Sequence, residues 1–160
     1  MNRLNALLET LSRIRPNATI WCGAAPADAG HEALFERLSY RPSGREVREL
    51  SREDATAWLS LLAAHSLNHG IGRAEAIALL NDVEFGFEEL SEGARFFSVG
   101  IWQVSRRGRK WDPLRAGEPW KGRTHMVDFS GPYVDGEGVG GAILGLDHKL
   151  AFVFGVVEDD

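Results

Sequence analysis

The sequence predicts an α+β fold in which a helical N-terminal half packs on a mainly antiparallel β-sheet from the C-terminal half. Apolar residues recur at helical spacing through the first 81 residues. From residue 82 onward, β-branched and aromatic residues separated by glycine predominate, which is typical of strands. A length of 160 residues suits one hydrophobic core, and no repeat or linker divides the chain. We therefore expect a single domain over residues 1–160, helix-rich over 1–81 and strand-rich over 82–160.

Four helices are expected in the first half. The first is amphipathic and ends before Pro16, because proline breaks a helix interior. Its apolar stripe consists of Leu4, Leu7, Leu8, Leu11 and Ile14. A short strand over 19–22 and a helix over 28–38 follow. Ser51 at an N-cap position, with the Asp54 carboxylate three residues on, predicts the start of a third helix. Residues 73–80 predict the fourth.

The second half is expected to form the sheet, with candidate strands over 83–87, 95–104 and 124–129. The clearest signal is a hairpin, because two apolar runs over 142–146 and 150–157 flank a three-residue turn, Asp147-His148-Lys149. Segments 106–122 and 130–141 are rich in glycine, proline and charge, and we interpret them as long loops. The glycine tract over 136–141 lacks the helix start and the lysine of a phosphate-binding loop.

The cysteine content and the hydropathy pattern indicate the compartment in which the protein is found. The single cysteine, Cys22, excludes an intramolecular disulfide and a thiolate metal cluster, and a reducing compartment fits best. Neither a signal-peptide pattern nor an unbroken apolar stretch of membrane-spanning length is present. We therefore expect a cytoplasmic protein that does not span a membrane.

The charge distribution is polarised along the chain, although the net charge is only −5. Residues 94–126 carry eight Lys or Arg and two acids, a net +6, whereas residues 127–160 carry one base and seven acids, a net −6. Aromatic side chains are interleaved with these charges, a composition that favours interfaces. The sequence thus predicts a partner-binding surface, comprising Arg107, Arg109, Trp111, Trp120, Asp128, Tyr133, Asp135 and Glu137.

Candidate chemistry is sparse. Arg123, His125 and Asp128 could together line a polar pocket, but a spacing of three does not place His125 and Asp128 on one face of a strand. His65 and His69 have metal-ligand spacing, yet Ser66 stands where a zincin helix has glutamate. The sequence therefore identifies no catalytic residue, no metal ligand set and no cofactor motif.

Three functions follow from these patterns. The first is a cytoplasmic protein-binding module that neutralises a macromolecular partner, as bacterial toxin-immunity proteins do, because blocking a basic cleft requires shape and charge rather than chemistry. The alternative is a small-ligand-binding protein or enzyme with its pocket around His125 and Asp128. A further alternative is a nucleic-acid-binding module that uses the basic loop over 95–123, which the acidic overall charge disfavours. The sequence does not indicate an oligomeric state.

Overall fold

The computed structural model describes residues 2–15, 18–38, 41–43, 47–64, 73–99, 126–130 and 135–158. Its helices and strands, in chain order, are α1 Asn2–Ser12, β1 Thr19–Pro26, the 3-10 turn Ala27–Ala29, α2 Gly30–Leu38, β2 Arg41–Ser43, β3 Val47–Leu50, α3 Arg52–Ala64, α4 Arg73–Ala78, α5 Leu80–Phe87, β4 Arg95–Val99, β5 Met126–Ser130, β6 Asp135–Leu146 and β7 Leu150–Glu158. Within these ranges no helix is both long enough and apolar enough to cross a membrane.

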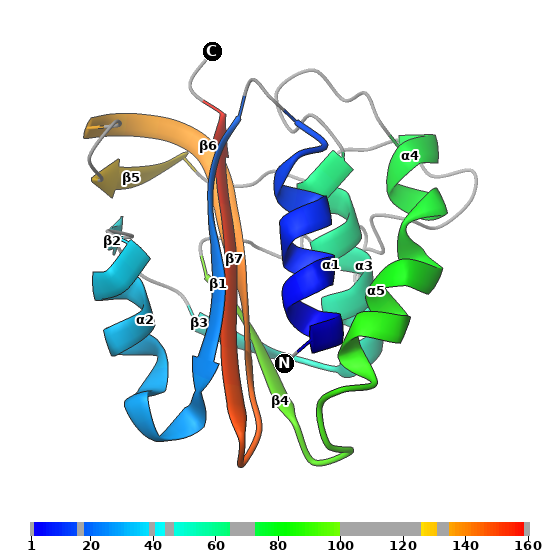
Figure 1. Cartoon of the computed structure of the whole chain (residues 1–160). Coiled ribbons are helices and arrows are strands. Elements are labelled where there is room, and N and C mark those ends of the chain that lie inside the picture. The colour runs from blue at the N-terminus through cyan, green and yellow to red at the C-terminus, as the bar shows by residue number, and fades with distance from the viewer. Residues whose placement is uncertain are drawn as a thin grey trace, which may run out of the picture.

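The described strands form one antiparallel sheet of seven strands, with the order β1-β7-β6-β4-β3 and with β5 and β2 continuing from the first half of β6. The long strand β6 is central, since its first half pairs with β5, its second half with β4, and its other edge with β7. Helices α1, α3, α4 and α5 cover one face of the sheet, and α2 lies on the other (Figure 1). The predicted α+β architecture with an antiparallel sheet is confirmed.

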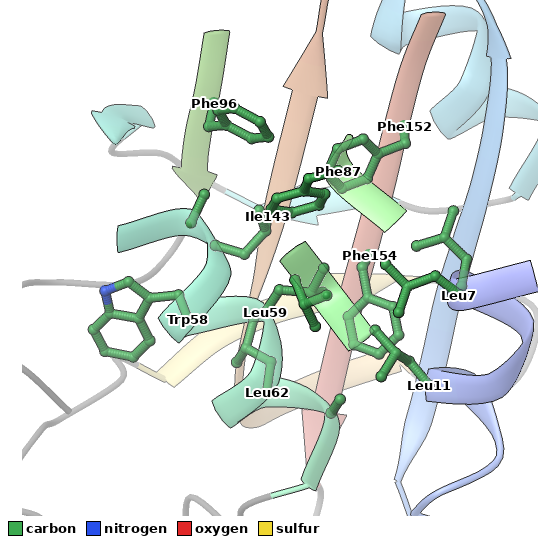
Figure 2. Packing of buried hydrophobic residues seen from close by; sticks show 14 of the residues in the cluster. Leu7, Leu11, Trp58, Leu59, Leu62, Phe87, Phe96, Ile143, Phe152 and Phe154 are labelled. Atoms are coloured by element: carbon green, nitrogen blue, oxygen red, sulfur yellow. The ribbon is translucent and has the colours of Figure 1, made fainter. Parts of the chain in front are cut away.

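The main core lies between the sheet and the four-helix layer. Alternation along β7 directs Phe152, Phe154 and Val156 into this core, while Val153 and Val157 belong to a smaller core under α2. Figure 2 shows Phe96, Phe152 and Phe154 of the sheet facing Phe87 of α5 and Leu59 and Leu62 of α3. Helix α3 is buried on nearly every side, because α1, α4, α5 and the sheet all contact it.

Several predicted elements are confirmed. Helix α1 buries its four leucines and ends at Ser12, just before the predicted limit. The Ser51 hydroxyl accepts a hydrogen bond from the Asp54 N–H at 3.0 Å, so the N-cap of α3 is as expected. The hairpin of β6 and β7 turns at residues 147–149, where the Asp147 N–H donates to the Leu150 carbonyl.

Two predictions were wrong. Residues 83–87 are the end of α5 and not a strand, because Val83, Phe87 and Leu90 have the i, i+4, i+7 spacing of a helix that buries one side. Residues 135–141 are not part of a loop but form the first half of β6. Residues 135–139 pair with β5 and residues 139–141 pair with β7, and this pairing compensates for the low strand propensity of glycine.

The boundary at residue 82 is also less sharp than expected. Strands β1, β2 and β3 come from the helix-rich first half, and most of α5 comes from the strand-rich second half. Strand β1 was expected only over 19–22 but continues to Pro26, pairing with β7 over its whole length. The two halves of the chain are therefore interleaved in one sheet.

Candidate functional site

The residues predicted to bind a partner divide into two groups. Arg107, Arg109, Trp111, Trp120 and Tyr133 lie outside the described residues, and so do Arg123 and His125 of the alternative polar pocket. The three remaining positions, Asp128, Asp135 and Glu137, are in paired strands: Asp128 is the register partner of Glu137, and Asp135 that of Ser130. The register therefore brings Asp128 and Glu137, which are nine residues apart in sequence, to adjacent positions in the sheet.

A different surface feature is fully described and was missed by the sequence analysis: a groove of about 480 Å³ between α1 and α5. Helix α1 contributes Arg3, Ala6, Leu7 and Thr10 to its lining. Helix α5 contributes Asp82, Phe85 and Gly86. The lining of this α1/α5 groove is mainly apolar, and Arg3, Asp82 and Thr10 add a guanidinium, a carboxylate and a hydroxyl to it.

The two helices form this groove because they approach closely at a glycine. A Cβ placed on Gly86 would overlap the Leu7 side chain, so a larger residue there would require Leu7 to shift or α1 and α5 to separate. The α1 N-terminus is also held to the segment after α5, because the Glu89 carboxylate accepts the Leu4 N–H at 3.0 Å. Partial burial raises the pKa of Glu89, but the hydrogen bonds that the carboxylate accepts outweigh this effect and lower the pKa overall.

Phe85 is the principal apolar group exposed at the groove. Its side chain is 54% exposed, the largest value among the large hydrophobic residues that the structure describes. The other two are Ile77 on α4, at 44%, and Ile14 just after α1, at 36%. All three thus belong to the helical layer on one face of the sheet. The Arg3 guanidinium lies 4.5 Å from the centre of the Phe85 ring and 3.5 Å from the Glu88 carboxylate.

The surroundings of Phe85 are strongly acidic. Between residues 82 and 92 the chain carries five acids and no Lys or Arg. Glu88 pairs with Arg3, and Glu89 caps α1. Asp82 and Glu84 are exposed and make no ion pair with any residue in the described part of the chain. An exposed aromatic ring beside carboxylates of this kind fits a partner that carries both an apolar pocket and positive charge.

Two polar side chains away from the groove, buried Asp147 and partly buried Arg52, are used within the fold. Asp147 accepts backbone hydrogen bonds from Ser91, Lys149 and Leu150. Arg52 donates to the carbonyl oxygens of Phe87 and Ser91. These bonds join the hairpin turn, the α5–β4 connection and the start of α3 through main-chain partners of the carboxylate and the guanidinium.

Cys22 on β1 is half-buried, as expected for a small apolar residue. Burial raises the pKa of its thiol, and the thiol hydrogen lies toward the Leu8 carbonyl, with Sγ 3.7 Å from that oxygen. The thiol is therefore held in its neutral form at neutral pH and is a poor nucleophile.

The sequence contained a signal for the α1/α5 groove. If residues 83–87 formed a strand, Val83, Phe85 and Phe87 would share one buried face. In a helix Phe85 points away from Val83 and Phe87, and so it becomes a surface residue with no obvious core role. The wrong secondary structure over these residues therefore concealed the site. Comparisons with protein-family models, with curated proteins and with solved structures find no match to this chain.

Proposed function

We propose that this chain is a cytoplasmic protein-binding module that neutralises a basic protein partner, in the manner of a bacterial toxin-immunity protein. The observation that carries the proposal is the exposed Phe85 ring at the α1/α5 groove, on the same helix as the exposed acids Asp82 and Glu84. An apolar centre with a charged rim is the usual anatomy of a protein interface. The partner's basic surface would be drawn to Asp82 and Glu84, and its apolar pocket would take up Phe85.

The charge of the whole chain supports the same assignment. A net charge of −5 makes the protein a poor ligand for nucleic acid and a suitable one for a cationic protein. The carboxylates of α5 add to the C-terminal acids predicted to bind a partner, Asp128, Asp135 and Glu137. Arg107, Arg109, Trp111, Trp120 and Tyr133 remain candidates for further contacts.

The experiment is a binding titration between the purified protein and the purified product of each gene that flanks its own. A stoichiometric complex with one product is expected, together with loss of that product's activity. Phe85→Ala should weaken the complex about 30-fold or more, the effect of truncating an interface anchor, without lowering the thermal stability of the free protein. Failure to form a complex with any flanking product would contradict the neutralising role.

A matched pair of charge reversals separates a local surface from a general charge effect. Glu84→Lys places a positive charge beside Phe85, whereas Glu36→Lys makes the same change on α2, on the opposite face of the sheet. Both glutamates are exposed. We expect Glu84→Lys to weaken the complex and Glu36→Lys to leave it unchanged. Equal effects would show that the protein binds through its net charge and not through this face.

A further inference from the structure

Among the strands that the structure describes, β1 lies at one end of the main order and pairs only with β7. It is eight residues long, it carries no charged side chain, and it keeps an unbroken register with β7 from Thr19 to Pro26. Natural edge strands are ordinarily protected by short length, charge or bulges. The strand at the other end of the main order, β3, has such protection, since it is four residues long and contains Arg48 and Glu49. In Figure 1, β1 is the strand nearest the viewer, with α1 and α2 on its two sides.

Two hydrogen bonds and one proline establish the direction of the β1 backbone groups. In an antiparallel ladder the N–H and C=O of one residue point to the same side, and successive residues alternate. The Ala27 N–H donates to the Lys149 carbonyl, so odd-numbered residues face β7. Pro26 has no N–H and therefore fits the outward-facing, even-numbered set. The Arg37 guanidinium donates to the Ala24 carbonyl at 3.0 Å, as it can if that oxygen faces outward.

It follows that the N–H and C=O groups of Ile20 and Cys22 face away from the sheet. Within the described part of the chain, neither backbone forms a hydrogen bond on that side. Two outward residues separated by one inward residue present the donors and acceptors that another antiparallel strand requires. Their side chains, by contrast, pack against the main core. Only the backbone groups of these two residues are therefore available for pairing at this edge.

We propose that β1 pairs with β1 of a second copy of this chain, in an antiparallel arrangement whose twofold axis passes at Trp21. Ile20 of each copy then exchanges both backbone hydrogen bonds with Cys22 of the other copy, giving four bonds. A strand without charges pairs with itself without placing like charges opposite each other, which makes β1 self-complementary. The two sheets become one continuous sheet, and the α1/α5 groove is not part of the proposed strand pairing.

The test is sedimentation of the full-length protein over a range of concentrations, with hydrogen exchange of individual amides. We expect a dimer, in which the Ile20 and Cys22 amides become as protected as those of Trp21 and Gly23, and we expect that protection to be lost on dilution. A protein that remains a monomer at every concentration overturns the proposal. So does protection of the two amides that appears only when a different protein is added, because the edge would then serve that protein.

Variants at position 22 separate the contribution of the backbone N–H to dimer formation from that of the side chain. Cys22→Pro removes the outward N–H and also fixes φ and replaces the side chain, whereas Cys22→Ala keeps the backbone N–H and changes only the side chain. We expect the proline variant to weaken the dimer about ten- to hundred-fold and the alanine variant to leave it essentially unchanged. If Cys22→Pro fails to fold, the hydrogen-exchange measurement on the unmodified protein decides. Sedimentation and hydrogen exchange require no partner protein, so the test of the dimer is independent of the proposed neutralising role.

Discussion

Asp147 is the residue on which the hairpin turn depends most. Its side chain is only 9% exposed, and it accepts N–H groups from Lys149 and Leu150 at 2.7 Å and from Ser91 at 2.9 Å. The first two bonds close the turn between β6 and β7. The third joins that turn to the connection between α5 and β4, which lies 56 residues earlier in the chain.

Asp147→Ala is therefore expected to destabilise the protein by about 2–4 kcal/mol, because it leaves three backbone donors without their charged acceptor. Lys149→Ala is the matched control in the same turn, since the Lys149 side chain is exposed and its N–H remains. Denaturant unfolding of both variants measures the difference. Equal stability of the two variants would show that the carboxylate contributes nothing to the turn.

The same carboxylate predicts how this contribution depends on pH. Desolvation raises the pKa of Asp147, but the hydrogen bonds from Ser91, Leu150 and Lys149 outweigh it and lower the pKa overall. A pKa lower in the folded than in the unfolded chain means that the stabilisation is complete above the unfolded-state value of about 3.9. The stabilisation is then lost as the pH falls through the folded-state pKa. The stability difference between the wild type and Asp147→Ala should therefore be constant near neutral pH and shrink in acid. A difference that grows in acid would contradict this assignment.

At the scale of elements, the packing of α5 on the sheet is organised around a glycine in β6. Gly145 is the register partner of Phe96 on β4 and of Phe152 on β7. The rings of Phe96 and Phe152 lie 4.9 and 5.5 Å from that of Phe87 on α5. A Cβ placed on Gly145 would overlap the Phe152 ring, so the aromatic cluster occupies the space that a side chain would need.

Gly145→Ala is accordingly expected to lower the free energy of unfolding by about 1–3 kcal/mol, the usual effect of overpacking a core. Gly93→Ala is the control, because a Cβ there meets no atom within 4 Å. Thermal unfolding of the two variants provides the measurement. If Gly145→Ala proved as stable as Gly93→Ala, the Phe152 ring would have to be free to move aside, and the cluster would not set the packing of α5.

Elements with a single dominant signal could be predicted from the sequence. The α1 stripe, the Ser51 cap and the turn at residues 147–149 are local patterns, and each gave nearly correct bounds. The first half of β6 was missed because its glycines owe their strand conformation to β5 and β7, which come from distant parts of the chain. Residues 83–87 were misread because five residues cannot distinguish a helical from a strand period.

At the scale of the whole molecule, the sequence indicated the fold class but not which helices lie on which face of the sheet. Nothing in the helical pattern of residues 30–38 shows that α2 lies on the opposite face of the sheet from α1 and α3. The order of the strands was equally inaccessible, because β1 pairs with β7 across almost the full length of the chain. The α1/α5 groove depends on that arrangement, and so it could not be predicted from the sequence.

The exposed carboxylates of α5 lead to a prediction about association rates. A partner steered by the α5 carboxylates should associate faster at low ionic strength, because exposed charges are screened over about 8–10 Å in ordinary salt. Added salt and Glu84→Lys should both reduce the association rate constant with the neutralised partner, while the dissociation rate constant changes little. Stopped-flow mixing measures both constants. An association rate independent of salt would contradict electrostatic steering.

The most direct test of the proposed docking face is its footprint in the complex, recorded as amide chemical-shift changes in the labelled protein during titration with the neutralised partner. The predicted result is a set of changes concentrated in residues 3–10 of α1 and 82–88 of α5, with α2 unaffected. Changes confined to α2, with α1 and α5 unperturbed, would contradict the account.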